Sequence, residues 1–382
     1  MTKIFPNALE PLSSPFNRQQ FAALSKLCDV EVLATIPWFP GARMFREISA
    51  AGRLIRVPDE DQVDGVRVHH PRFFFLPRFG HALSAGFYAA SLYSTVKAYR
   101  GKIDVLLGSW AYPDGAATVM LGKMLGLPTV VKLHGSDINV VAEMRGPRQI
   151  LKWTLPKASR VVAVSRALAD KAVSLGVSRD RIAIVPNGVD QDLFHVRDRN
   201  HARGVIGIKH TGPLFVYVGR LERAKGVFDL ARAFEKIPRT DVELVYVGDG
   251  SARAELEKLA APFAGRIKIV GAQPLSDIPL WMAASTAIVL PSHNEGTPNV
   301  ILEAFACGRP AVATTVGGIP DLITSPELGE LVALGDEAAL TTALGHAATR
   351  SYDPEKIVKI GARGGWEESA TKLYRVLREA IA

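Results

Sequence analysis

The sequence predicts an α/β protein made of two doubly wound domains, each a parallel sheet covered by helices on both faces. Three observations lead to this fold class. The chain has 382 residues, which is enough for two compact domains of ordinary size. Short β-branched runs alternate with helical stretches in both halves. A polar, turn-rich stretch at 187–204 separates the two series.

The first series predicts a domain over residues 1–190. Its expected strands are 30–36, 103–109, 129–135, 160–165 and 182–187, and its expected helices include 19–27, 114–125 and 167–174. These strands are continuously apolar, which suits a parallel sheet that is buried on both faces.

The second series predicts a domain over residues 191–365. Its expected strands are 213–220, 242–249, 267–271, 287–292, 310–314 and 329–334. The final helical stretch, 366–382, can cap this domain or cross back onto the first, and we predict that it crosses back. Because ligands bind outside the carboxyl ends of the strands in such sheets, we expect two Rossmann-like domains that face each other across a cleft.

Charge is unevenly distributed along a chain of ordinary globular composition, with 48% hydrophobic and 22% charged residues. Residues 1–190 hold 24 Lys and Arg against 15 Asp and Glu, a net charge of +9, and residues 191–382 hold 22 against 23, a net charge of −1. A basic first half indicates an anionic partner, such as a phospholipid surface or a phosphorylated acceptor. A basic face that is only solvated explains the count equally well. We expect no nucleic-acid partner.

Compartment signals favour the cytoplasm. Cys28 and Cys307 are the two cysteines, and they show neither metal-ligand spacing nor a disulfide framework. The first residues lack the apolar core of a signal peptide, and no window reaches the roughly 18 apolar residues of a membrane span. The stretch HHPRFFFLPRFG (69–80) fits either a lipid interface, with the protein peripheral on the inner face of the cytoplasmic membrane, or a buried loop or edge strand whose rings fill the core.

The stretch SHNEGTPNVILEAFACGRP (292–310) predicts a helix start beside a strand end. Thr297 is a good N-cap, and Pro298 fits the first helical turn, where a missing N–H costs nothing. The free N–H groups near Asn299 and Val300 would then lie at the carboxyl edge of the sheet. Such a helix end favours a phosphate.

Two carboxylates flank this helix start. Glu295 lies in the preceding loop, and Glu303 lies inside the helix, one turn beyond Asn299. A carboxylate accepts hydrogen bonds from vicinal hydroxyls, so the two acids suit the hydroxyl-rich parts of a ligand whose phosphates occupy the helix end. A nucleotide sugar has this chemistry. The spacing of the two glutamates is weak evidence by itself, because a loop charge and an exposed helix residue would give the same pattern.

Further residues follow other strand ends. Arg220 and Lys225 can clamp a diphosphate, Arg as a fork and Lys as a point charge, and can stabilise charge on a departing diphosphate. Gly248, in VGDG, allows close backbone approach to a ligand. In the first half, HGSD delivers His134 and Asp137 to the end of a central strand, where we expect a ligand role rather than simple packing.

Together these residues resemble the retaining glycosyltransferases of family 4, which have the two-domain GT-B fold. The resemblance covers most of the chain from about residue 100 onward, and it runs through HGSD (134–137), VSRAL (164–168), PNGVD (186–190), GRLERAKG (219–226), VGDG (247–250) and the specific block 292–321. The stretch FPNALEPLSSPFNRQQFAAL and IPWFP (36–40) are similar to the branch that contains teichuronic-acid and exopolysaccharide glycosyltransferases.

The resemblance implies roles for the matching donor-side residues. Arg220 and Lys225 would hold the donor diphosphate, and Glu303 would bind the ribose hydroxyls. Glu295, with the backbone of Gly296–Thr297 and Asn299–Val300, would hold the sugar and the distal phosphate.

Roles in the first domain follow from the same resemblance. His134 would contact the transferred sugar near its reactive carbon, and Asp137 would support that loop on the acceptor side. Asn17 and Arg18 are expected on the acceptor side. The family's glycine-rich turn is absent from the loop before them, which leaves the N-terminal acceptor contacts open.

The implied reaction moves a sugar from a nucleotide diphosphate sugar to a hydroxyl of a saccharide or lipid-linked acceptor, in cell-envelope or exopolysaccharide synthesis. Family mechanisms retain the anomeric configuration by same-face attack, with the leaving diphosphate taking the acceptor proton. The nucleotide sugar is a substrate, and we expect neither a cofactor nor a metal, because the two cations already offset the diphosphate charge.

Three alternatives compete with a transferase. A GT-B epimerase or phosphorylase is one, although no pyridoxal phosphate lysine site is recognisable. A nicotinamide-dependent oxidoreductase shares the double layout, but no strand-linked GxGxxG is followed by a suitably placed acidic residue. A non-catalytic sugar-nucleotide-binding protein is the third.

Overall fold

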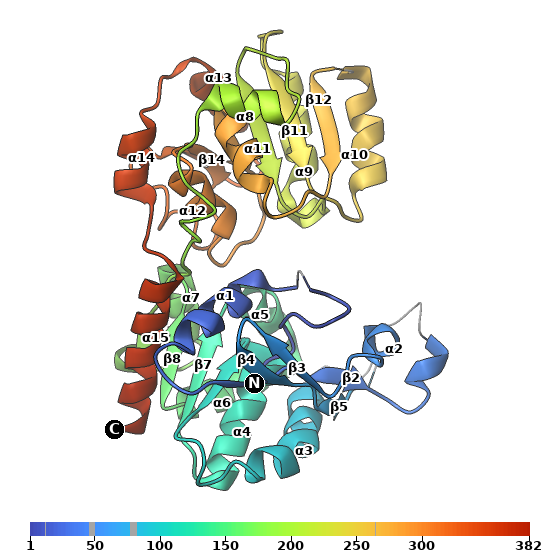
Figure 1. The fold of residues 1–382 in the computed structure, drawn as a ribbon, viewed down its shortest axis with the longest axis vertical. Helices are drawn as coiled ribbons and strands as arrows, with labels where there is room; N and C mark the ends of the chain where they lie inside the picture. The colour runs from blue at the N-terminus through green and yellow to red at the C-terminus, as the bar shows by residue number, and fades with distance from the viewer. Residues whose placement is uncertain (12, 46–49, 77–81, 264) are drawn as a thin grey trace. The chain divides into compact units, whose positions relative to one another are not determined.

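The computed structural model describes residues 1–11, 13–45, 50–76, 82–263 and 265–382. They form two compact units: unit 1 is Met1–Gly188 with Trp366–Ala382, and unit 2 is Val189–Gly365. The sequence analysis divided the chain after residue 190 and separated the helix at 366–382. Each unit contains a parallel sheet with helices packed against it, which confirms the predicted fold class (Figure 1).

The central sheet of unit 1 is parallel, in the order β6-β7-β8-β9. Its strands are β6 (Leu106–Ser109), β7 (Thr129–Leu133), β8 (Arg160–Ala163) and β9 (Ile182–Ile184). The α-helices of this unit are α1 (Pro15–Leu24), α2 (Ala50–Leu54), α3 (Ser84–Lys97), α4 (Ala116–Leu125), α5 (Ser136–Asn139), α6 (Arg145–Thr154), α7 (Arg166–Ser174) and α15 (Trp366–Ile381). The predicted strands were correct in position and longer than the observed ones.

Alternation along β7 explains why apolar residues occupy successive positions in most of this strand. Val131 and Leu133 face a core shared with α4, α6 and α7. Val130 faces the opposite core, which α1 and α15 supply, with Leu373 fully buried there. Since side chains alternate across a strand, a sheet covered on both faces needs apolar residues at successive positions. The final helix thus covers one face of the unit 1 sheet.

Short strands extend unit 1 near the N-terminus. They are β1 (Glu31–Leu33), β2 (Ile36–Trp38), β3 (Glu60–Val63), β4 (Val66–His69) and β5 (Arg72–Phe74), paired as β1-β4-β3 and β2-β5. The Thr2 N–H donates to the carbonyl of Leu33, and the Ser109 N–H donates to the carbonyl of Met1, each at 3.0 Å. Residues 1–2 therefore connect β1 to β6. The sequence predicted a single strand at 30–36 and an edge strand as one alternative for 69–80, where β5 lies, whereas β3 and β4, which are short and partly polar, were not predicted.

The aromatic stretch of residues 72–75 packs inward onto α3. Phe73 is 4% exposed, and its ring centroid lies 4.8 Å from that of Tyr88. The Phe74 ring meets the Phe87 ring at 5.1 Å. Of the two interpretations of this stretch, the rings therefore fit the core-filling one. Arg78 and Phe79 lie outside the described residues.

Unit 2 contains one six-stranded parallel sheet in the order β12-β11-β10-β13-β14-β15. Its strands are β10 (Leu214–Val218), β11 (Glu243–Val247), β12 (Ile267–Gly271), β13 (Ala287–Leu290), β14 (Ala311–Thr314) and β15 (Gly329–Val332). Its α-helices are α8 (Arg199–Val205), α9 (Val227–Glu235), α10 (Arg253–Ala260), α11 (Ile278–Ala284), α12 (Asn299–Ala306), α13 (Glu337–Thr349) and α14 (Pro354–Gly361). All six strands match the predicted ones.

No helix among the described residues is long and apolar enough to cross a membrane.

Candidate active site

The strand order places the switch point of unit 2 between β10 and β13. From β10 the sheet grows outward through β11 to β12, and it then grows in the other direction through β13, β14 and β15. Ligands of doubly wound sheets bind outside the carboxyl ends of the strands at such a point. The loops that leave it are 219–226 and 291–298, which carry Arg220, Lys225 and Glu295.

Lys225 and Glu295 form an ion pair between these two loops. Lys225 Nζ lies 2.7 Å from Glu295 Oε1, and the side chains are only 23% and 12% exposed. The His293 N–H also donates to the carbonyl of Ala224 at 2.9 Å. A pair this sheltered is screened by salt less than a surface pair. The predicted cation and acid are therefore brought together at the switch point.

The side chain of Arg220 lies apart from the Lys225–Glu295 ion pair. Its guanidinium donates to Glu222 Oε1 at 2.7 Å and is 72% exposed, and it makes no hydrogen bond or ion pair with Lys225 or Glu295. The hydroxyl of Tyr217 donates to the Arg220 carbonyl at 2.8 Å, so the backbone of the residue is held even though its side chain faces solvent. The two cations predicted to clamp one ligand thus occupy different environments.

Two glycines mark places where neighbouring loops touch. A Cβ at Gly248, with φ +147°, would lie 1.9 Å from the carbonyl oxygen of Gly219. A Cβ at Gly317, with φ +54°, would lie 1.8 Å from the carbonyl oxygen of Glu295. No side chain fits at either position. The sequence analysis assigned Gly248 to ligand approach, and the structure adds that this glycine is already required by backbone packing.

The helix predicted near Thr297 begins slightly later. α12 starts at Asn299, and its cap residue is Pro298, with φ −74° and ψ 114°. The predicted N-cap, Thr297, was therefore wrong by one residue. The difference lies in Pro298 itself, whose ψ of 114° is extended and not helical, so the first residue with helical backbone is Asn299. Gly296 lies in the loop before it and accepts from the Gly318 N–H at 2.9 Å.

Glu303 is a half-buried carboxyl on α12. Burial raises the pKa of Glu303 to about 7. Among the described residues its carboxyl group makes no hydrogen bond or ion pair, in contrast to Glu295. Burial, with a smaller effect of the Glu303 carboxyl, raises the pKa of the neighbouring Cys307 thiol to about 12. Glu303 is therefore available to accept hydrogen bonds from a ligand, and the backbone N–H groups of Asn299 and Val300 lie in the first turn of the same helix.

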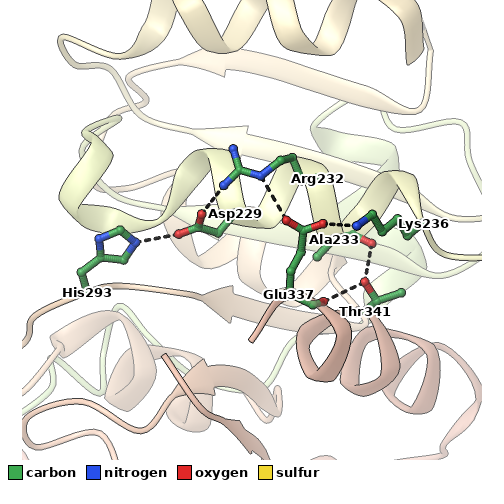
Figure 2. A network of polar contacts seen from close by, with 7 residues as sticks. All are labelled: Asp229, Arg232, Ala233, Lys236, His293, Glu337 and Thr341. Atoms are coloured by element: carbon green, nitrogen blue, oxygen red, sulfur yellow. Dashed lines mark hydrogen bonds and ion pairs between the residues drawn. The ribbon is translucent and has the colours of Figure 1, made fainter. Parts of the chain in front are cut away.

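A polar network fixes the loop after β13 to two helices (Figure 2). His293 Nε2 lies 2.6 Å from Asp229 Oδ2 on α9. Asp229 pairs with Arg232, whose Nε donates to Glu337 at the start of α13 at 3.1 Å. Thr341 then donates to the carbonyl of Ala233 at 3.1 Å. The sequence analysis missed this network, since nothing local links residues that lie so far apart in the chain.

In unit 1, His134 follows β7 and is enclosed by a second group of side chains. Its Nε2 lies 2.8 Å from Ser109 Oγ at the end of β6. Ser109 also donates to Asn17 Oδ1 at 2.9 Å. The rings of Phe16 and Trp110 lie 4.9 and 5.9 Å from the imidazole centroid. Burial, with a smaller effect of Lys132, lowers the pKa of His134 well below its ordinary value, so the ring is neutral at pH 7.

Asp137 is fully buried and holds the loop that carries His134. Its Oδ2 accepts from the Ala111 N–H at 2.7 Å, and its Oδ1 accepts from the Gly135 N–H at 2.6 Å. The His134 N–H lies 3.1 Å from both oxygens. Burial raises the pKa of Asp137, while these backbone contacts act in the opposite direction. Both carboxylate oxygens thus accept hydrogen bonds from backbone N–H groups.

The two other predicted acceptor-side residues, Asn17 and Arg18, lie in different surroundings. Asn17 is fully buried next to Ser109, and its Nδ2 donates to the carbonyl of Ile4 at 2.8 Å. Arg18 points to solvent, where it forms a bidentate ion pair with Asp64 at 2.7 and 2.8 Å. Neighbours in sequence on α1 therefore lie in different environments, one buried and one in contact with solvent.

Three residues of this group were missed by the sequence analysis. Ser109 ends β6, and Trp110 follows it with a strained φ of +131°. Lys132 is fully buried on β7 and donates to Gln20, and burial lowers the pKa of Lys132 to about 7. Their signal in the sequence was their position at or near strand ends, because the carboxyl ends of parallel strands share one edge.

Among the described residues, no group of three or more His, Cys, Asp or Glu side chains is arranged to hold a metal ion.

Comparison with solved structures identifies the architecture. Sucrose-phosphate synthase from Thermosynechococcus elongatus superposes with a TM-score of 0.68 at 22% identity, covering 85% of this chain and 86% of the other. HepE of Anabaena, solved in complex with UDP, gives a TM-score of 0.70 at 19% identity, covering 91% of this chain and all of the other. These similarities show the GT-B fold.

Comparison of sequences identifies the family. Residues 22–193 match the family described as glycosyltransferase family 4, and residues 212–350 match glycosyl transferases group 1. TuaC of Bacillus subtilis (strain 168), a glycosyltransferase named for teichuronic acid biosynthesis, is 29% identical over 94% of this chain and 90% of its own length. The D-inositol 3-phosphate glycosyltransferase of Frankia alni is 31% identical over 74% of this chain and 75% of its own. The predicted resemblance is confirmed, and the chain belongs to the family 4 glycosyltransferases.

Proposed function

We propose that this glycosyltransferase moves a sugar from a nucleoside diphosphate sugar to a hydroxyl of a saccharide or lipid-linked acceptor in cell-envelope polysaccharide synthesis. The observation that carries the proposal is the Lys225–Glu295 pair, 2.7 Å apart at the switch point of a doubly wound sheet. A cation there suits a diphosphate, and an acid there suits sugar hydroxyls. The similarity to TuaC supports the class of product.

Unit 2 supplies the donor contacts in this proposal. Lys225 and the first N–H groups of α12 bind the diphosphate, and Arg220 turns from Glu222 to join them. Glu303, which has no partner among the described residues, accepts the ribose hydroxyls, and Glu295 with Gly296 and Thr297 contacts the sugar. Lys225 is paired with Glu295, so binding a diphosphate exchanges one charged partner for another.

The transfer is proposed to retain the anomeric configuration. The acceptor oxygen bonds to the anomeric carbon on the face from which the diphosphate leaves, the bond from that carbon to the diphosphate oxygen breaks, and the acceptor proton passes to the departing diphosphate. The cations at the switch point stabilise the charge that develops on the leaving group. His134, neutral at pH 7, contacts the transferred sugar. Glu295 acts as a sugar ligand and forms no covalent bond.

Nucleotide binding tests the donor class. Thermal shift and calorimetry with UDP, GDP, ADP and NAD should show stabilisation by at least one nucleoside diphosphate. A shift with NAD and none with any nucleoside diphosphate would overturn the proposal in favour of an oxidoreductase. Mass spectrometry of donor hydrolysis without acceptor then identifies the sugar. NMR of a product made from an α-linked donor tests retention, since a β-linked product contradicts it.

A membrane surface is the second proposed partner, and one helix of unit 1 supports it. The exposed side of α6 carries Arg145, Arg148 and Lys152 next to Trp153, whose ring is 51% exposed. Lys157 Nζ lies 3.6 Å from the centre of that ring. Cations around an exposed tryptophan suit an anionic lipid interface. We propose that this face binds the anionic inner surface of the cytoplasmic membrane.

A further inference from the structure

The imidazole of His134 is the end of a hydrogen-bond chain whose donors and acceptors can be assigned. The chain runs from the carbonyl of Ile4 through Asn17 and Ser109 to His134, with separations of 2.8, 2.9 and 2.8 Å. Asn17 and Ser109 are both fully buried, so water does not compete for the bond between them. Each link therefore constrains the next one.

Asn17 has one possible orientation in this chain. The carbonyl of Ile4 only accepts hydrogen bonds, so the amide nitrogen of Asn17 must face it. The amide oxygen then faces Ser109, and this oxygen also only accepts. The single hydroxyl proton of Ser109 is consequently used towards Asn17.

Ser109 is left with only lone pairs to offer His134. The bond of 2.8 Å between Ser109 Oγ and His134 Nε2 therefore requires the proton on Nε2. In a neutral imidazole the other nitrogen, Nδ1, then carries a lone pair. We propose that Ser109 and Asn17 are positioning residues that fix this tautomer, so that His134 presents Nδ1 as a hydrogen-bond acceptor to a hydroxyl of the transferred sugar.

The surroundings of the ring agree with this role. Among the described residues Nδ1 makes no hydrogen bond, and it is not among the side-chain atoms that are both sealed from solvent and without a partner. The rings of Phe16 and Trp110 lie 4.9 and 5.9 Å away and restrict rotation of the imidazole. The lowered pKa keeps the ring neutral, which Nδ1 needs in order to accept. The choice of sugar as ligand rests on the proposed function.

The tautomer itself can be measured without any substrate. Two-bond proton–nitrogen correlation spectra of the full chain labelled at histidine distinguish protonation at Nε2 from protonation at Nδ1, and His134→Gln assigns the signals. We expect the wild type to show a neutral ring with the proton on Nε2 from about pH 6 to 8. A ring protonated at Nδ1, or a charged ring at neutral pH, overturns the inference even if the Ser109 variant does not fold.

Ser109→Ala should remove the hydroxyl oxygen that accepts from His134 Nε2, and the His134 imidazole should then be a mixture of its two neutral tautomers. Thr154→Val is the matched control, because Thr154 is equally buried in unit 1 but bonds only to the carbonyl of Ile150. We expect Ser109→Ala to lower kcat of transfer about tenfold, the effect of one ordinary hydrogen bond, and to leave UDP affinity unchanged. Thr154→Val should change neither. An Nε2 proton that persists in Ser109→Ala, with unchanged kcat, contradicts the proposal.

The outcomes separate this inference from the proposed function. If the tautomer is as expected but no nucleoside diphosphate binds, the donor proposal fails, and the assignment of the ring proton stands. If nucleoside diphosphates bind but the proton lies on Nδ1, the donor proposal stands, and the role of Ser109 and Asn17 is refuted.

Discussion

At the scale of single residues, Lys225 and Glu295 are each other's ion-pair partner. A charged ligand that binds one of them must therefore replace the other. Their 2.7 Å contact neutralises both groups within unit 2. A diphosphate that reaches Lys225 must compete with the carboxylate of Glu295. Substitution of the two residues should therefore have opposite effects on the binding of a nucleoside diphosphate without a sugar.

The first prediction concerns this pair. Lys225→Ala should weaken binding of UDP or another matching nucleoside diphosphate by about 1.5–3 kcal/mol, the size of one charge-assisted hydrogen bond. Glu295→Gln should leave that affinity unchanged or raise it, since it removes the competing charge, while it weakens binding of the nucleotide sugar. Calorimetry measures all three variants, with Lys258→Ala on exposed α10 as the control. Equal losses in Lys225→Ala and Lys258→Ala would show that Lys225 does not meet the phosphates.

The second prediction concerns Glu303 and pH. Burial raises the pKa of Glu303 from 4.5 to about 7. Between these values the folded protein keeps a proton that the unfolded chain has lost, so this group makes the protein less stable as the pH rises from about 4.5 to about 7. Urea denaturation near pH 5 and near pH 8 should show that Glu303→Gln gains stability relative to the wild type at the higher pH. If the difference in unfolding free energy between Glu303→Gln and the wild type is the same at both pH values, Glu303 does not titrate in this range.

At the scale of elements, the site depends on loops that approach each other more closely than side chains allow. The loop after β14 touches the loop after β13 at Gly317, where a Cβ would lie 1.8 Å from the carbonyl oxygen of Glu295. The ends of β10 and β11 meet in the same way at Gly248. Strand order thus brings four segments of the chain to one edge, and glycine permits the final contact.

The third prediction distinguishes the destabilisation caused by this close contact from the destabilisation caused by a positive φ alone. Gly317→Ala should cost about 3 kcal/mol of stability and should weaken nucleoside diphosphate binding, because the loop that carries Glu295 must move. Gly335→Ala is the matched control, since Gly335 also has a positive φ, +78°, but has nothing within 4 Å of its Cβ position. It should cost about 1 kcal/mol and leave binding unchanged. Urea unfolding and calorimetry measure both effects, and equal results for the two variants would contradict the packing argument.

At the scale of the whole molecule, the chain forms two units, and its C-terminal helix belongs to the first. α15 packs on α1 and on the strands of unit 1, and Ser369 on α15 accepts from Gln20 Nε2 at 2.9 Å. Residues far apart in the chain are therefore required for one folded unit. The stability of unit 1 should depend on α15, and nucleotide binding should depend on unit 2.

The fourth prediction tests this division. Leu373→Ala, at a fully buried position of α15, should destabilise unit 1 by about 2–5 kcal/mol. Urea unfolding should then show an earlier transition for unit 1, while UDP still stabilises unit 2 as in the wild type. Lys372→Ala changes an exposed neighbour and should have an effect below about 0.5 kcal/mol. Loss of UDP binding in Leu373→Ala at low urea would argue against separate units.

The fifth prediction concerns the proposed membrane face on α6. The protein should sediment with vesicles that contain anionic lipid, and binding should fade as salt rises, because long-range attraction between exposed charges is screened. Lys152→Glu should weaken this binding, whereas Lys258→Glu in unit 2 should not. Sedimentation that is independent of both lipid charge and ionic strength would refute the proposal.

The sequence by itself determined the fold class, the strands of both central sheets and the family. Periodicity and continuous apolar runs report burial of each strand on both faces, which is a local property of the chain. It also predicted Lys225, Glu295 and Glu303 as donor-site residues, because they follow strand ends or lie near a helix start, and this assignment stays a prediction. It placed the start of α12 one residue too early, since helix ends depend on details of the turn.

Only the tertiary structure decided which side chains meet. It paired Lys225 with Glu295 and turned Arg220 towards Glu222, and it separated buried Asn17 from exposed Arg18. It also joined Ser109 to His134, and His293 to Asp229. Such contacts link residues on different strands and helices, so they depend on sheet order and loop geometry. No local pattern in the sequence records that information.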